Sequence, residues 1–337
     1  MAAVDPVGGN RGVLGFKEIV QLVEGDLAKV ENLFEEQMRS DVPLVAEIAR
    51  YVRDGGGKSI RPALLLLAAR LCASGGDRAI LLAGVVEFIH SATLLHDDII
   101  DGATVRRGRR SVNSRWGNDI TVLLGDFLYT KAMSMALSQD NLRILRLLSD
   151  VTLRMTEGQL LEIEHDRDID VTPDEHVDII RRKTADLFAA CTRIGAMLGD
   201  SGDEKEQALA RYGLHLGICF QMIDDLLDFT ATEEVLGKPV ASDLRDGKLT
   251  LPTIFLMQRG GAAAREKVAA VLEDGGFERV SRDELVRLAW DSGAIDEARR
   301  LAADYAKRAL ADLAPFERTT YREALAYLPE FLLARDR

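Results

Sequence analysis

The sequence predicts an all-α protein, a large single-domain helical bundle. Only eight prolines occur in 337 residues, which leaves long stretches where a helix can run without interruption. Leucine, alanine, glutamate and arginine recur at helical spacing, and alternating Val-rich or Thr-rich segments are absent. Apolar residues make up 47% of the chain, enough for a sizeable core. No linker, repeat or low-complexity tract divides it, so we expect one domain over residues 14–337 behind a flexible tail at 1–13.

The first half of the chain contains four expected helices. Apolar residues such as Ile19, Leu27 and Phe34 place an amphipathic helix at 16–38. A second helix at 42–52 is broken by the glycines at 55–57, and a third begins near Arg61, with Pro62 in a first turn that tolerates proline. A long helix then covers 77–101, followed by a basic loop at 106–110.

The second half continues the helical pattern. Helices are expected at about 120–138, 141–164, 173–198 and 202–230, then a polar loop at 237–249, then four or five more helices to the C-terminus.

Composition excludes several classes of protein. A net charge of −12 and a pI near 5.1 argue against a nucleic-acid partner. The three cysteines lack metal-ligand or disulfide spacing and fit buried thiols in a reducing compartment. The start resembles no signal peptide, and the apolar run at 63–69 is too short to span a bilayer. We therefore expect a cytoplasmic protein without a transmembrane segment.

Two acidic clusters dominate the functional interpretation. Asp97, Asp98 and Asp101 have spacing i, i+1, i+4 on the helix at 77–101, and Asp224, Asp225 and Asp228 repeat that pattern. On a helix the first and last of each set lie one above the other, and uncompensated carboxylates there repel. The first set also lies at a helix C-terminus, where partial negative charge disfavours it. Carboxylate oxygens select Mg²⁺ rather than zinc, and Mg²⁺ completes its shell with phosphates and water.

Scattered basic residues would supply partners for such phosphates; they are Lys58, Arg61, Arg106, Arg107, Lys183, Lys238 and Lys248. The segment Gly55 to Ser59 is not a nucleotide-binding phosphate loop, because Val52 stands where the motif needs glycine and no strand precedes it. A rival interpretation uses Glu87 with His90 and Glu162 with His165, the Glu-x-x-His pairs of carboxylate-bridged di-iron bundles. That ferritin-like alternative leaves both aspartate clusters without a role.

The chain resembles the trans-polyprenyl diphosphate synthases, of the long-chain, octaprenyl type, from about Val42 to the C-terminus. The motifs that support this resemblance are Gly-Gly-Lys-Ser-Ile-Arg-Pro at 56–62, His90 with Asp-Asp-Ile-Ile-Asp at 97–101, Arg-Arg-Gly at 106–108, Lys-Thr at 183–184, Phe-Gln at 220–221 with Asp-Asp-Leu-Leu-Asp at 224–228, and Gly-Lys-Pro at 237–239. The resemblance implies an isoprenoid synthase type I fold with a central cavity, usually homodimeric. It also implies a prenyltransferase that joins isopentenyl diphosphate to an allylic diphosphate, farnesyl or geranylgeranyl diphosphate.

The resemblance also implies roles for individual residues. Lys58, Arg61, His90 and Arg107 would bind isopentenyl diphosphate, and the allylic diphosphate would be bound by Arg106, Lys183, Thr184, Gln221, Lys238 and Lys248. Asp97, Asp101 and Asp224 would ligate about three Mg²⁺ ions, for which Mn²⁺ can substitute, with Asp98, Asp225 and Asp228 in support. Arg335 and Arg337 are expected in a solvated tail, with a position over the isopentenyl diphosphate site as the alternative.

Product length is predicted from the residues that precede the first acidic cluster on the same helix. Ala92 and Thr93 lie about one turn, ~5.4 Å, beneath the metals. Small residues there leave a tunnel open, and Met133 on a facing helix is the expected lower floor. We expect products of roughly C35 to C50 from tunnel depth at ~1.5 Å per residue, with geranylgeranyl (C20) diphosphate as the alternative. Release of such a product would involve transient membrane association. A terpene cyclase would not need the Arg61 and His90 set, and a non-catalytic partner subunit would lack the aspartates.

Overall fold

The computed structural model describes residues 16–54, 59–231 and 241–335. Within these ranges the chain is almost entirely helical, with one short two-stranded hairpin, so the predicted all-α class is confirmed. Lys58 and Lys238, two of the predicted phosphate-binding residues, lie outside the described residues, as does the tail at 1–13.

The first half of the chain follows the prediction with one correction. Its helices are α1 (Phe16–Gln21), α2 (Glu24–Gln37), α3 (Pro43–Asp54), α4 (Ile60–Leu71) and α5 (Asp77–Ile100). The single helix predicted at 16–38 is wrong, because the backbone leaves helical geometry at Val23. The break accompanies an ion pair between buried Asp26 of α2 and Arg70 of α4, a tertiary contact that sequence periodicity does not report.

The basic segment after α5 is more ordered than the predicted loop. It forms a hairpin of β1 (Val105–Arg106) and β2 (Arg109–Arg110), followed by the short helix α6 (Val112–Trp116). Sequence periodicity could not indicate strands of two residues, because they are too short to show alternation.

The middle of the chain contains α7 (Asn118–Leu137), α8 (Leu142–Glu164), α9 (Pro173–Ile180), a π-helical turn η1 (Arg181–Ala185), α10 (Asp186–Leu198) and α11 (Asp203–Thr230). The helix predicted at 173–198 is thus continuous in extent but contains one wide turn. Such π-turns are frequent at functional sites, and this one contains Lys183 and Thr184.

The C-terminal part begins with the one-turn helix α13 (Ser242–Arg245) inside the predicted polar loop. The five helices that follow are α14 (Leu251–Arg259), α15 (Gly261–Asp274), α16 (Arg282–Asp291), α17 (Ala294–Asp312) and α18 (Thr320–Ala334). They match the prediction of four or five.

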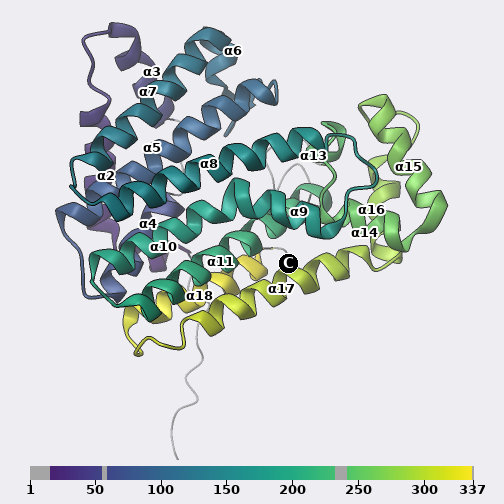
Figure 1. The fold of residues 1–337 in the computed structure, drawn as a ribbon. Helices are drawn as coiled ribbons and strands as arrows, with labels where there is room; N and C mark the ends of the chain where they lie inside the picture. Colours follow the sequence, from purple (N-terminus) through teal and green to yellow (C-terminus); the bar gives the residue numbers. More distant parts are fainter. Residues whose placement is uncertain (1–15, 55–58, 232–240, 336–337) are drawn as a thin grey trace, which may run out of the picture.

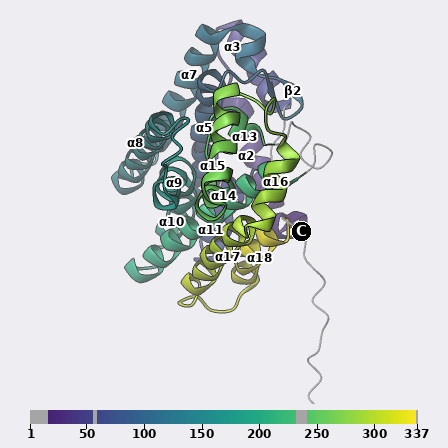
Figure 2. The same cartoon turned by 90° about the vertical axis from the view of Figure 1, so that its right-hand side faces the viewer.

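The long helices lie side by side and enclose a common core (Figure 1). α5 packs against α7, α4 and α2, while α11 packs against α10 and α17. Viewed from the end, α14, α15 and α16 cover one end of the bundle (Figure 2). Within the described residues α5 and α7 are long and apolar enough to cross a membrane, and 61% and 39% of their apolar windows are buried. For α5 this composition follows from its central position, because a helix buried on most sides is apolar all round.

Two glycines bring neighbouring helices close to the π-turn. A Cβ atom on Gly158 of α8 would lie 2.7 Å from the backbone nitrogen of Lys183, and one on Gly217 of α11 would lie 2.7 Å from Cα of Ala185. Because any larger residue would collide with backbone, both contacts require glycine. They hold α8 and α11 against the turn that contains Lys183.

Candidate active site

The first acidic cluster points in two directions from the end of α5. Burial raises the pKa of Asp97, and the nearby cation of Lys183 acts against that rise. Asp98, only 2% exposed, faces the hairpin instead: its Oδ1 accepts from Arg106 Nε at 2.5 Å, and its backbone oxygen accepts from Asn113 Nδ2 at 3.0 Å. Asp98 therefore anchors the hairpin, and Arg106 is already paired with it.

Glu162 of α8, which the sequence analysis did not select as a site residue, connects the basic residues of the site. Its carboxylate accepts from Lys183 Nζ at 2.5 Å and lies 3.6 Å from Lys248 Nζ. Lys248 also donates to Asp101 at 3.0 Å. Burial pushes the pKa of Glu162 up, but the two lysines together bring it below its ordinary value. One network of alternating charge thus joins four residues: Asp101 at the end of α5, Lys248 after α13, Glu162 of α8 and Lys183 of η1.

The second acidic cluster is also divided between partners. Asp224 lies 3.4 Å from Arg335 at the end of α18, so the expectation that Arg335 belongs to a solvated tail is wrong. The packing of α18 against α4 and α11 brings its end to the site. Asp228, 3% exposed, accepts from Ser242 Oγ at 2.8 Å and from the backbone nitrogen of Asp243 at 3.1 Å. It therefore holds the start of α13 against α11.

Asp225 belongs to a buried relay of hydrogen bonds. Its Oδ2 pairs with His176 Nε2 of α9 at 3.0 Å, and its Oδ1 accepts from Gln221 Nε2 at 2.9 Å. The Gln221 Oε1 atom accepts in turn from Thr184 Oγ1 at 3.1 Å. The relay connects α9, the π-turn and α11. His176 was not expected in the site, since its partner is 49 residues away in sequence.

A separate basic group lies between α4 and α5. Arg61 Nη1 donates to His90 Nε2 at 2.9 Å, and its Nε is buried without a hydrogen-bond partner among the described residues. Burial holds the pKa of His90 well below its ordinary value, and Arg61 and Arg107 lower it further. Burial raises the pKa of nearby Glu87. A buried guanidinium with a free donor beside a neutral histidine suits an anionic ligand.

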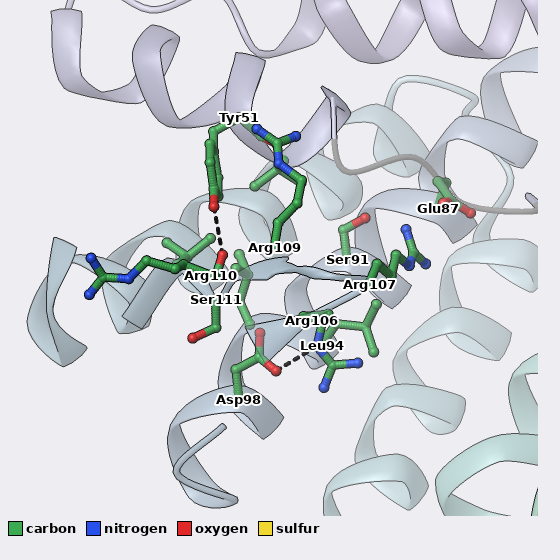
Figure 3. Close-up of a pocket in the computed structure, with 13 residues that line it drawn as sticks. Tyr51, Glu87, Ser91, Leu94, Asp98, Arg106, Arg107, Arg109, Arg110 and Ser111 are labelled. Atoms are coloured by element: carbon green, nitrogen blue, oxygen red, sulfur yellow. Dashed lines mark hydrogen bonds and ion pairs between the residues drawn. The ribbon is translucent and has the colours of Figure 1, made fainter. Parts of the chain in front are cut away.

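The hairpin arginines border a pocket of about 610 Å³ close to this group. Figure 3 shows Arg106 turned toward Asp98, whereas Arg107 extends toward Glu87. Arg107 and Arg106, predicted to bind different ligands, therefore do leave the hairpin in different directions.

A larger cavity, open on one side and of about 960 Å³ with its solvent-filled mouth included, lies between α5, α7 and α8 along the turns of α5 that precede the first acidic cluster. Ala92 and Thr93 contribute to its wall from α5, as predicted, and Tyr129 faces them from α7. The remaining lining residues are Ile89, His96, Asp126, Ser149, Thr152, Leu153 and Thr156. Met133 is half-buried against the core and is not among the residues that line this cavity, so its role as floor stays a prediction.

Within residues 16–54, 59–231 and 241–335, no three His, Cys, Asp or Glu side chains lie close enough to hold a metal ion by themselves. The residues of the di-iron alternative have other partners: His90 pairs with Arg61, and Glu162 pairs with two lysines. Mg²⁺ does not need such a protein cage, because one or two carboxylates with substrate phosphates suffice. Asp97, Asp101 and Asp224 provide the hard oxygen donors that it prefers.

Comparison with known proteins gives consistent matches over the length of the chain. The polyprenyl synthetase family model matches residues 42–287. Octaprenyl diphosphate synthase of Escherichia coli (strain K12) is 37% identical over 324 residues, 96% of this chain and 100% of that protein. Geranylgeranyl diphosphate synthase of Methanosarcina mazei is 36% identical over 294 residues, 86% of this chain and 89% of that protein. The crystal structure of a polyprenyl synthase from Caulobacter crescentus CB15, complexed with calcium and isoprenyl diphosphate, matches with a TM-score of 0.91 and 36% identity, covering 97% of this chain and 100% of that one.

Proposed function

We propose, from the premise that this chain belongs to the polyprenyl synthetase family, that it condenses isopentenyl diphosphate with an allylic diphosphate to give a long-chain all-trans polyprenyl diphosphate. It is a prenyltransferase with the all-α isoprenoid synthase fold. The reaction proceeds by ionisation of the allylic diphosphate, condensation and elimination of a proton. We propose a product of roughly C35 to C50, from tunnel depth at ~1.5 Å per residue of lining helix.

The observation that supports this proposal best is the position of the 960 Å³ cavity directly below the first acidic cluster, with small Ala92 and Thr93 in its wall. A growing apolar chain needs a water-poor space that starts at the reacting carbon. No Phe, Tyr or Trp of α5 obstructs the first turn below Asp97, since residues 92–96 are Ala, Thr, Leu, Leu and His. The cavity therefore favours long products over the C20 alternative.

The residues around the acidic clusters suit the allylic diphosphate. We propose that Lys183, Lys248 and Arg106, with Thr184 and Gln221, bind its oxygens, and that Lys238 joins them. Asp97, Asp101 and Asp224 would hold about three Mg²⁺ ions, or Mn²⁺ in their place. Bound divalent cations supply charge stabilisation for the leaving diphosphate. The lysines add fixed positive charge at the same oxygens, where negative charge accumulates as the bond breaks.

The group around Arg61 suits the second substrate. Arg61, whose Nε has no hydrogen-bond partner among residues 16–54, 59–231 and 241–335, would bind the diphosphate of isopentenyl diphosphate together with His90, Arg107 and Lys58. His90 stays neutral because its pKa is held low by burial, so it takes part through a hydrogen bond rather than a charge. A terpene cyclase would have no use for this second anion site. We assign the final proton to an oxygen of the departed diphosphate.

Product analysis tests the proposal. Purified protein is incubated with Mg²⁺, labelled isopentenyl diphosphate and farnesyl or geranylgeranyl diphosphate, and the hydrolysed products are separated by length. The expected products have about seven to ten isoprene units, from the same tunnel-depth estimate. Products that stop at geranylgeranyl length would favour the C20 alternative, and absence of any condensation would overturn the proposed function.

We also propose that the enzyme is a cytoplasmic homodimer of single-domain subunits. Leu123 of α7 and Leu153 and Leu160 of α8 are each at least 60% exposed, and exposed apolar side chains on neighbouring helices indicate an interface. Tyr129 and Leu153 are also exposed where they line the cavity, so a second copy would cover its outer wall. The substitution Leu153→Glu should convert the dimer to a monomer in size-exclusion chromatography with light scattering. A wild-type monomer would contradict the proposal, and cell fractionation tests the location and any transient membrane association of the product-bound enzyme.

A further inference from the structure

The hairpin that presents Arg107 depends on contacts outside itself. Its turn residues, Arg107 and Gly108, both have positive φ, 52° and 73°, as a two-residue type I′ turn requires. Glycine adopts this conformation freely, but an arginine there costs of order 1–3 kcal/mol and persists only when its surroundings enforce it. A hairpin with strands of two residues is also marginal by itself.

One side of the hairpin is fixed by the Asp98–Arg106 pair. The other side is fixed by Tyr51, in the last turn of α3. The Tyr51 hydroxyl donates to the backbone oxygen of Arg110 at 2.7 Å, and the backbone oxygen of Tyr51 accepts from Arg109 Nη1 at 3.4 Å. Figure 3 shows the Tyr51 ring upright beside Arg109, with its hydroxyl bonded to the β2 backbone.

The Tyr51 ring also contacts two cations, Arg109 and Arg115, whose like charges repel each other. The Arg109 guanidinium lies 4.3 Å from the ring centre and that of Arg115 lies 4.6 Å from it. Arg115 also lies 4.4 Å from the ring of Trp116, which meets Tyr51 edge to face at 5.0 Å. Each cation–π contact contributes about 0.5–1 kcal/mol where exposed and more where water is excluded. We call this group, Tyr51, Arg109, Arg115 and Trp116, the aromatic clamp.

In Figure 3, Tyr51 and Arg109 of the aromatic clamp lie away from the guanidinium of Arg107. With Arg106 held by Asp98 and Arg109 held by Tyr51, Arg107 at the turn extends toward Glu87 (Figure 3). Its charge also acts on Arg61 and His90, which places it near that group. We propose that Tyr51 is a positioning residue for isopentenyl diphosphate: it fixes the hairpin so that Arg107 is aimed at the diphosphate before the substrate arrives. This inference rests on the proposed function.

Binding and kinetics of Tyr51 variants test the inference. Tyr51→Leu should raise both the Kd for isopentenyl diphosphate, measured by calorimetry, and its KM about tenfold, which corresponds to about 1.4 kcal/mol. The KM for the allylic diphosphate should change less than threefold. Tyr51→Phe retains the ring and its cation contacts, so it should recover most of the affinity. In an Arg107→Ala background, Tyr51→Leu should cause no further loss, because the effect passes through Arg107.

Tyr305→Leu is a matched control, since Tyr305 also contacts an arginine, Arg308, at 4.8 Å, but on α17. It should leave both KM values unchanged. If Tyr51→Leu does not fold, Arg109→Met breaks the same clamp from the hairpin side and should raise the KM for isopentenyl diphosphate at least fivefold. A change below twofold in the folded variant, or an equal rise in both KM values, would overturn the inference. A wild-type protein that does not condense the substrates would instead overturn the proposed function.

Discussion

Replacing Ala92 by phenylalanine should shorten the product to about fifteen carbons. Ala92 is 3% exposed and lies in the wall of the 960 Å³ cavity, five residues before Asp97. At ~1.5 Å per residue this places it about 7.5 Å below the metal-binding carboxylate. The added ring can enter the cavity, so the fold should survive at a cost of about 1–3 kcal/mol.

The expected length follows from the size of an isoprene unit. An extended chain advances about 3.5 Å per three bonds, so an isoprene unit of about four chain bonds spans ~4.7 Å by the same geometry. The space above position 92 then admits about two units beyond the one that carries the diphosphate. Growth should therefore stop at about three units.

The assay is thin-layer or liquid chromatography of hydrolysed products made from labelled isopentenyl diphosphate. Ala92→Leu should give products of intermediate length, because its side chain fills less of the cavity. Leu142→Phe, at a position 72% exposed, is the control and should leave the product length unchanged. If folded Ala92→Phe still makes products of wild-type length, the chain does not grow through this cavity and the reasoning is refuted.

Three further predictions concern the acidic residues. Asp97→Ala and Asp224→Ala should each lower turnover by several orders of magnitude with unchanged helical circular dichroism; activity within about tenfold of wild type, ~1.4 kcal/mol of barrier, would contradict the metal assignment. Asp98→Asn should lower the free energy of unfolding in urea by about 1 kcal/mol, because Arg106 is partly exposed and solvent screens the ion pair that is lost; an unchanged midpoint would show that the pair does not stabilise the hairpin. Lys183 and Lys248 lower the pKa of Glu162 in the folded protein. The ionised carboxylate therefore stabilises the folded state at pH values above the pKa that Glu162 has in the unfolded chain, and this stabilisation is lost as the pH falls through its folded-state pKa. Glu162→Gln should therefore be less stable than wild type at pH 7 by about 2 kcal/mol and nearly equal to it near pH 3, and a gap that does not shrink at low pH would argue against the ion pairs.

Much of the fold could be predicted because helical signals are local. The bounds of α5, α8 and α11 agree with the prediction within a few residues, since apolar periodicity and terminal glycines act within a few turns. Their acidic clusters could be placed on one helix face for the same reason. The interruption at Val23 and the π-turn at 181–185 could not be predicted, because the contacts that accompany them join segments far apart in the sequence.

The partners of the site residues, in contrast, could not be predicted from the sequence. Glu162 looked like half of an iron ligand pair, yet it holds Lys183 and Lys248, which lie 21 and 86 positions away in sequence. His176 pairs with Asp225, a partner that the sequence does not identify, and Arg335 lies near Asp224 although a solvated tail was expected for it. None of these pairings produces a periodic pattern in the sequence, because the partner of a charged side chain depends on which helices pack against each other.

The sequence by itself therefore determined the fold class, the order of helices, the two carboxylate clusters and the class of ligand that they require. Those properties depend on residue type and on spacing along one helix, where the geometry is fixed at 3.6 residues per turn. Only the tertiary structure decided which carboxylates anchor loops, which cation each one meets, and which residues line the cavity between α5, α7 and α8. These depend on distances between helices, and close packing fixes such distances only when the whole chain is folded.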